Sequence, residues 1–524
     1  FEKIGYRDAV QVRPYPREDA SFDPNDIKFS CVKYANTMGE SLSSSARIDP
    51  RSGEILSATI CIPHNVTSRI RTDLFVQLGA GDPDARRVKM STELFRKALA
   101  ADVARHTGAC LGLAVNYAGS YCVPVDSLRS PSFTQRYGIS ASIMDELPYN
   151  LVAQPGDKER GVALMQQGPG VYDEYVVDWL YRPVPGAVTP EDEVAELDRR
   201  IAARRSDPMC LYTPPPVAVA LDPRSMPYNL GDDPVRAAAY EFANYAYVMK
   251  HADEWIGEED ADYTFRSLVQ ASVMNQLYYA FVSVSANLGG VYLNEKHEGD
   301  ALPTYLSVPR GLQRRALQFM LEQLEDMSWL DNERLNKDVV EVVSLGEYCR
   351  DMLSDVIFKS LSTLDLSASK SDDPYTQDDA MDDLYRYILR DVAAGRESTE
   401  ANIAMQRLLL INVIRNAGVV TQTRRSAASA SAFAGEALPD AAALSRRAKM
   451  ARVFPEMTSD PVSGVLPMRS VAFMVRPAVD YKRYGMLLDM KKLYRNALGT
   501  PASERMKNHY RYMLLAIDRA LKVD

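Results

Sequence analysis

The residues whose types and spacing could do chemistry stand in one short segment. Residues 104–117 read Ala-Arg-His-Thr-Gly-Ala-Cys-Leu-Gly-Leu-Ala-Val-Asn-Tyr. This spacing fits a zinc-hydrolase motif of the form His-Glu-x-x-His-x-x-Gly-x-x-His, with Gly112 at the glycine. The three ligand positions of that motif then fall on Arg105, Ala109 and Val115, and the position of its catalytic glutamate falls on His106.

These residue types do not fit zinc. A catalytic zinc site needs about three protein ligands and a group that takes a proton from the bound water. Ala109 and Val115 carry no donor atom, and Arg105 is a permanent cation that repels a divalent metal. We therefore expect that zinc is lost, and we expect no other cofactor.

A relocated metal site is the alternative. His106 and Cys110 stand four residues apart and can share a helix face, but that face points about 100° away from the original one. The simpler interpretation makes Cys110 a buried apolar residue and His106 a packed or solvated one. The chain has 5 His, and no two of them stand at metal-ligand spacing: His64, His106, His251, His297 and His509.

The frame around the lost ligands is intact and carries a family resemblance. The segments concerned are Phe1-Glu-Lys-Ile-Gly-Tyr-Arg-Asp-Ala, Asp49-Pro-Arg-Ser-Gly-Glu-Ile-Leu-Ser-Ala, the motif anchors Gly108, Leu111, Gly112, Leu113 and Asn116, then Pro124-Val-Asp-Ser-Leu-Arg-Ser-Pro, Ala141-Ser-Ile-Met-Asp, Leu230-Gly-Asp-Asp-Pro and Asn287-Leu-Gly-Gly-Val-Tyr. Together they resemble the large zinc-dependent metallopeptidases of bacterial envelopes, which carry a metzincin-like catalytic domain. The similarity covers most of the chain.

The resemblance implies a fold, a turn and a location. The fold would be an α/β metzincin-like (zincin) domain followed by a mostly α-helical C-terminal region. Met144 would be the methionine of the Met-turn beneath the metal, with Asp145 beside it and Glu146 where the family usually has Tyr. The location would be the periplasm or outer-membrane surface of a Gram-negative bacterium. The family's large N-terminal regions and any export signal are absent from this sequence, so we expect a C-terminal fragment or a processed form.

Arg105 also suggests what replaces the metal. A guanidinium at a former ligand position can fill the cavity and pair with Asp145 or Glu146, which would substitute a fixed cation for the metal charge. An ordinary surface arginine is the alternative.

Composition argues against some classes of partner and of structure. A net charge of −9 argues against nucleic-acid binding, which needs a basic face. No run of about 18 apolar residues is present, so no transmembrane segment is expected. The 6 Cys are too few for a disulfide scaffold and favour free thiols, with Cys110–Cys122 as the alternative bridge.

Local signals divide the chain into four parts. An alternating segment at 54–62 predicts an ordinary strand. The resemblance offers the alternative that this strand is a sheet edge that pairs with extended peptide. The predicted parts are residues 1–185 as the metzincin-like domain, 186–230 as a Pro-rich connector, 231–420 as a helical domain and 421–524 as a C-terminal loop and helical segment, with an Ala/Ser-rich stretch at 425–445. Capping and amphipathic patterns predict helices at 91–113 (capped by Ser91 or Thr92), 190–205, 233–256, 262–287, 310–328, 338–363, 377–394, 398–416 and 501–522.

These expectations converge on a pseudopeptidase: a catalytically inactive homologue of a zinc metallopeptidase that binds a peptide or protein within an envelope complex. Two alternatives stay open. One is an active metallopeptidase with a relocated metal at His106 and Cys110, or a metal-free mechanism built on His106, Asp145 and Glu146. The other is a regulatory subunit of an active paralogue. The sequence leaves the ligand, the oligomeric state and the openness of the cleft undetermined.

Overall fold

The structure is a computed structural model that describes residues 1–522, except 167, 214–220, 295–302, 336–343 and 420–480. The chain forms two compact units, of which the first ends at Tyr375 and the second begins at Thr376. This division lies inside the predicted helical domain 231–420. The boundaries predicted at 185, 230 and 420 remain predictions. The Ala/Ser-rich stretch and most of the loop predicted after residue 420 lie outside the described residues.

A three-stranded sheet opens the first unit. Its strands are β1 (Cys31–Ala35), β2 (Ser43–Ile48) and β3 (Ile55–Pro63), in the order β1-β3-β2. β1 runs parallel to β3 and β2 runs antiparallel to it, with Val32 opposite Ile60 and Ser44 opposite the same residue from the other side. The strand predicted at 54–62 is therefore present but central.

The favoured interpretation of 54–62 as an ordinary strand is confirmed, and the alternative of a sheet edge is wrong. Both sides of β3 are paired, so its backbone groups are satisfied within the sheet and cannot accept an added strand. Strand order depends on contacts between distant residues, and the local alternation could not reveal it. β2 is an outer strand of the described sheet, and it packs against α2 (Thr92–Cys110).

One helix, α2, covers the sheet and carries the degenerate motif, and α1 (Val66–Asp73) packs beside it. α1 continues through a π-helical turn at Leu74–Leu78, and α2 packs against β2 and β3. α2 begins as predicted, because the Ser91 hydroxyl accepts from the Leu94 amide at 3.5 Å. The core between sheet and helices contains Leu42, Ile60, Val66, Ile70, Leu74 and Ala98.

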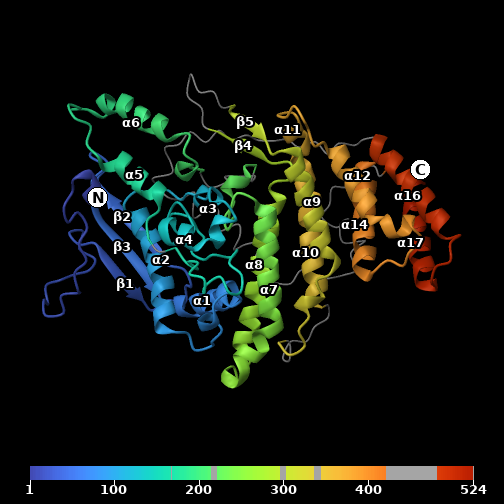
Figure 1. Ribbon diagram of the computed structural model, residues 1–524, viewed down its shortest axis with the longest axis horizontal. Coiled ribbons are helices and arrows are strands. Elements are labelled where there is room, and N and C mark those ends of the chain that lie inside the picture. The colour runs from blue at the N-terminus through green and yellow to red at the C-terminus, as the bar shows by residue number, and fades with distance from the viewer. Residues whose placement is uncertain (167, 214–220, 295–302, 336–343, 420–480, 523–524) are drawn as a thin grey trace. The chain divides into compact units, whose positions relative to one another are not determined.

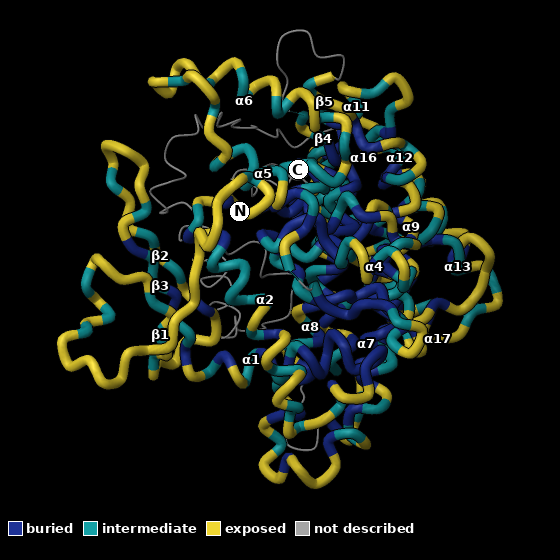
Figure 2. The backbone as a smooth tube through the Cα atoms, turned by 60° about the vertical axis from the view of Figure 1, so that its left-hand side comes forward, coloured by how far each residue is buried: buried dark blue, intermediate teal, exposed yellow. Residues whose placement is uncertain are grey.

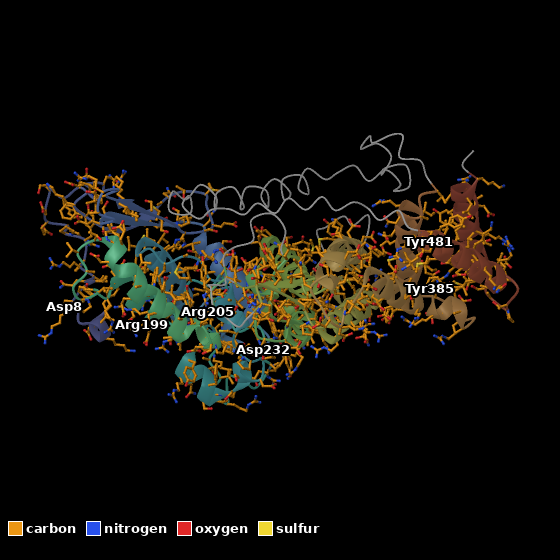
Figure 3. All side chains as sticks on the ribbon, turned by 90° about the horizontal axis from the view of Figure 1, so that it is seen from above. Asp8, Arg199, Arg205, Asp232, Tyr385 and Tyr481 are labelled. Atoms are coloured by element: carbon orange, nitrogen blue, oxygen red, sulfur yellow. The ribbon has the colours of Figure 1, made fainter. Side chains whose placement is uncertain are left out.

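Shorter elements follow α2. They are α3 (Ala118–Tyr121), α4 (Pro131–Tyr137), α5 (Val171–Tyr181) and α6 (Pro190–Arg204). α6 confirms the helix predicted at 190–205 within the connector, and its Arg199 is labelled in Figure 3. Single 3₁₀ turns lie at Glu2–Ile4, Pro83–Ala85, Ser127–Arg129, Pro208–Cys210, Pro223–Ser225, Gly257–Glu259, Ser328–Leu330 and Leu361–Thr363.

Long helices complete the first unit (Figure 1). α7 (Pro234–Ile256) starts where predicted, because the Asp233 carboxylate accepts from the Arg236 amide at 3.2 Å and Pro234 holds the first position. α7 and α8 (Thr264–Ser285) are among the most deeply buried elements in Figure 2. The unit closes with a hairpin that the sequence did not predict, β4 (Val291–Leu293) with β5 (Tyr305–Ser307), and with α9 (Arg310–Glu325), α10 (Leu345–Ser360) and α11 (Leu364–Ala368).

Every described element of the second unit is a helix. Its elements are α12 (Gln377–Ile388), α13 (Arg390–Ala393), α14 (Glu400–Asn416), α16 (Tyr481–Ala497) and α17 (Glu504–Leu521). Gln406 organises the interior: its carbonyl oxygen lies 2.9 Å from both Tyr494 Oη and His509 Nε2. α16 was not predicted. Among the described helices, none is long and apolar enough to cross a membrane.

A buried ion pair joins the ends of α7 and α8, and its loss should destabilise the first unit. Arg266 is 4% exposed and contacts Asp253 at 3.1 Å and Asp260 at 3.3 Å. Arg266→Leu leaves buried carboxylates without their cation, so we expect a loss of roughly 3–5 kcal/mol in the free energy of unfolding.

Urea unfolding followed by tryptophan fluorescence measures this change, because the 3 Trp of the chain, Trp179, Trp255 and Trp329, all precede residue 376. Arg236→Leu is the matched control. It removes an exposed pair with Asp126 and should cost less than about 1 kcal/mol. Equal effects of the two substitutions would contradict the proposed importance of the buried pair.

Candidate functional site

The frame of the motif is built by the last turn of α2 and the turn that contains Met144. Gly108 faces Met144 so closely that a Cβ at Gly108 would lie 2.5 Å from Met144 Sδ. The Leu113 amide donates to the Gly108 carbonyl at 3.0 Å, and Gly112 has a φ of +84°, which favours glycine. The chain thus turns sharply after α2, and Met144, 1% exposed, lies beneath the helix end.

Asn116 fixes the position just beyond the third ligand position. It is fully buried, and its backbone amide donates to the Met144 carbonyl at 3.2 Å. Its side chain donates to the Leu211 carbonyl at 2.9 Å and accepts from the Thr213 amide at 3.2 Å. The backbone of Asn116 therefore joins the motif to the Met144 turn, and its side chain joins the motif to the predicted connector.

The start of the predicted helical domain is tied to the loop after the motif, just ahead of α7. Gly231 donates to the Ser120 carbonyl at 3.1 Å, and Asp232 (labelled in Figure 3) donates to the Val123 carbonyl at 3.0 Å. The Asp232 carboxylate also accepts from the Val125 amide at 3.1 Å. Residues far apart in sequence therefore hold the loop after the motif, which the sequence pattern did not predict.

Two buried carboxylates shape the Met144 turn. Asp173 accepts from the Ser142 hydroxyl at 2.7 Å, the Ile143 amide at 2.8 Å and the Gly170 amide at 2.7 Å. Asp145 accepts from the Ser120 amide at 2.7 Å through Oδ2, while its Oδ1 is buried without a hydrogen-bond partner among the described residues. Burial raises the pKa of Asp145 to about 7.

The former ligand positions hold an ion pair and an open surface. Arg105 Nη1 lies 3.9 Å from Glu146 Oε1, so the guanidinium pairs with Glu146 and does not stand free in solvent. Ala109 is exposed and Val115 is half-buried. A cation and two aliphatic side chains supply no donor to zinc, so these residues do not fit the metal.

His106 is held away from that surface. Its Nδ1 lies 2.9 Å from Ser44 Oγ on β2, and its Nε2 lies 3.5 Å from Arg105 Nη2. Burial and the charge of Arg105 lower its pKa to about 4, so the ring is neutral at pH 7. Cys110 is 8% exposed, and burial raises the pKa of its thiol, which also interacts with Ser44.

The structure therefore brings His106 and Cys110 to the same serine. A metal would need further ligands, and among the described residues no group of three or more His, Cys, Asp or Glu side chains could hold one. The metal-free constellation is dispersed over different partners: His106 contacts Ser44, Asp145 contacts Ser120, and Glu146 pairs with Arg105.

Tyrosines that the sequence did not indicate surround Glu146. The hydroxyl of Tyr117, which is 3% exposed, interacts with the Glu146 carboxylate, and burial and this carboxylate raise the pKa of Tyr117. Tyr228 has a φ of +62°, an uncommon conformation for a bulky residue, and its ring lies 4.4 Å from that of Tyr279. Burial and the nearby Glu146 also raise the pKa of both tyrosines.

A half-buried cluster supports α2 behind His106. Arg69 on α1 pairs with Asp102 on α2, contacts Asp73 at 3.0 Å and donates to the Glu40 carbonyl at 3.0 Å. Burial raises the pKa of Asp73 to about 6, even though Arg69 lowers it. Arg69 thus contacts both carboxylates and compensates part of their charge.

The raised pKa of Asp145 predicts a pH-dependent stability. The folded state binds this proton more tightly than the unfolded chain, whose Asp has a pKa near ~3.9. The stabilising contribution is therefore complete below about pH 4 and is lost as the pH rises to about 7. Wild type should lose on the order of 4 kcal/mol relative to Asp145→Asn across that interval.

Urea unfolding at several pH values, again followed by tryptophan fluorescence, measures this difference. Asp126→Asn is the control, because Asp126 has a side chain that is 79% exposed. A wild-type minus Asp145→Asn difference that does not change with pH would contradict the assignment.

The geometry of this frame also predicts that zinc-binding side chains can be introduced at the three ligand positions of the motif. The triple variant Arg105→His, Ala109→His and Val115→His should bind about one zinc per chain, because the turn at Gly112 and the Met144 floor are kept. Titration against a chromophoric chelator measures the affinity. In the control, Ala114→His replaces Val115→His and moves the third ligand out of register. Equal zinc affinity in both variants would contradict a preorganised frame.

Comparison with known proteins places this frame in a family. A family model described as Met-zincin matches residues 87–395, which is more than half of the chain and includes α2, the Met144 turn and helices α7 to α11. No curated protein and no solved structure matches the chain. The expected relationship is confirmed, and the chain belongs to the Met-zincin family.

Proposed function

We propose that this protein is a catalytically inactive, metallopeptidase-like member of the family that captures a peptide or protein without cutting it. The observation that carries the proposal is a contrast between the ligand positions of the motif and the backbone frame around them. The positions that would hold zinc carry Arg105, Ala109 and Val115, while the Gly108–Met144 contact and the turn at Gly112 are kept. Family membership supports a metallopeptidase-like fold. We propose in addition that this fold has the zincin arrangement.

The capture surface would combine β2 with the C-terminal turn of α2. β2 is paired with β3 on one side, and it ends the described sheet on the other, so an extended peptide can add to it by backbone hydrogen bonds. Ser44 on this strand contacts His106, and Ala109 is exposed on the helix nearby. A peptide on β2 would therefore pass close to Arg105.

Hydrolysis has no evident route at this surface. A peptidase must activate water and stabilise the charge of the tetrahedral intermediate. His106, at the catalytic position, has a pKa near 4, and its Nδ1 is engaged by Ser44. It is a poor base at neutral pH, which favours binding over cleavage.

Two further functions remain as alternatives. A relocated metal would start from His106 and Cys110, which share Ser44 as a neighbour. A regulatory subunit would bind an active paralogue, and co-purification of a peptidase would favour it. By the resemblance, we place the protein in a bacterial envelope complex, in the periplasm or at the outer-membrane surface.

The test is the metal content and the peptidase activity of untagged protein. We expect far less than one zinc per chain by elemental analysis and no cleavage of a general peptidase substrate. About one zinc per chain, with cleavage that His106→Ala abolishes, would replace the proposal with an active enzyme. The control Ser45→Ala lies on the opposite face of β2 and should change neither measurement.

A further inference from the structure

The guanidinium of Arg105 is contacted only loosely. Charge-assisted hydrogen bonds between a guanidinium and a carboxylate span about 2.7–2.9 Å. Arg105 lies 3.9 Å from Glu146 and 3.5 Å from His106, and its side chain is 29% exposed. An arginine carries five N–H donors in a fixed fork, so this one retains donors that face a partly open surface.

Glu146 does not depend on Arg105 alone. Its carboxylate also interacts with the Tyr117 hydroxyl, and Tyr228 and Tyr279 stand close enough to feel its charge. An incoming anion can therefore hydrogen-bond to the Arg105 guanidinium while Glu146 keeps the Tyr117 hydroxyl as a polar partner. Asp145 is buried beside Glu146 and accepts from the Ser120 amide. Asp73 and Asp102 are already engaged by Arg69.

The surroundings of Arg105 fit a flat, polar group at the end of a peptide or side chain. Ala109, one turn along α2, is exposed and presents only a methyl group. His106 is held by Ser44 and is neutral at pH 7. The ring therefore carries no charge that would attract or repel the Arg105 guanidinium. A planar carboxylate matches the fork of Arg105 in two parallel hydrogen bonds.

We propose that Arg105 binds a carboxylate of the captured peptide, in the place where a hydrolytic relative would bind metal. This inference rests on the proposed peptide capture and specifies what is recognised. The carboxylate comes either from the C-terminus of the peptide or from an Asp or Glu side chain, and the experiment separates the two sources.

The probe is a randomised octapeptide library labelled with rhodamine, with binding to the full chain followed by fluorescence anisotropy. Four versions are compared: a free or an amidated C-terminus, each with or without Asp and Glu in the random positions. We expect the version without any carboxylate to bind roughly tenfold or more weakly than the one with both. The two intermediate versions show which source is used.

Variants at the site give a signed prediction. Arg105→Ala should abolish the preference for carboxylates, and Glu146→Gln should strengthen carboxylate binding several-fold because it removes a competing anion. Arg105→Lys should retain only part of the preference, since a lysine cannot form the two parallel bonds. Arg96→Ala, on an exposed position of the same helix, is the control and should match wild type.

The outcomes separate this inference from the proposed function. If all four libraries bind equally well, or if Glu146→Gln weakens binding, carboxylate recognition by Arg105 is overturned while peptide capture stands. If no library binds at any concentration tested and Arg105→Ala is folded by circular dichroism, both peptide capture and carboxylate recognition are overturned.

Discussion

The contact between Gly108 and Met144 is the constraint on which the site depends. Because no Cβ fits at Gly108, the Met144 turn packs directly against the last turn of α2. That close approach brings the Met144 carbonyl to the Asn116 amide and sets the path of the chain after Gly112. Every former ligand position is placed by this small set of contacts, and none of these contacts involves a ligand side chain. The frame can therefore persist when the ligands are replaced.

Buried carboxylates rigidify the frame, and these carboxylates lose their hydration in the folded state. Asp173 satisfies three donors around the turn, whereas Asp145 satisfies fewer and keeps one oxygen without a partner among the described residues. An incompletely satisfied carboxyl is costly when ionised, and this explains why its proton is held up to nearly neutral pH. The charge of Arg105 is matched more loosely, at the surface of the same region, by Glu146.

Local signals predicted much of this chain, and distant contacts account for what they missed. Ser91 and Asp233 are side-chain caps and marked the starts of α2 and α7 correctly. The order of strands, in contrast, follows from pairing between segments, so the central position of β3 could not be predicted. α16 was missed because its buried face includes Arg483, which pairs with Asp378, and its interior contains Gly485, both of which obscure an amphipathic pattern.

The same distinction holds at the site. The motif alone identified the positions that carry no zinc donor, and it offered the pairing of Arg105 with a neighbouring carboxylate beside the alternative of a surface arginine. Tyr117 stands in the motif region, but Tyr228 and Tyr279 reach Glu146 from segments much later in the chain, so no spacing rule could join them. Ser44 likewise becomes relevant only because β2 lies against α2. The sequence indicated which positions of the motif carry no zinc donor, and the structure shows which residues surround them.

The most direct test of the central claim is a crystal structure of the protein grown with zinc, with anomalous scattering measured at the zinc edge. If the frame is kept without the metal, no anomalous peak will lie among residues 105, 109 and 115, and the Arg105 guanidinium will be found beside Glu146 with Met144 against Gly108. A strong peak at that position, or at His106 and Cys110, would contradict the account and restore a metal to this site.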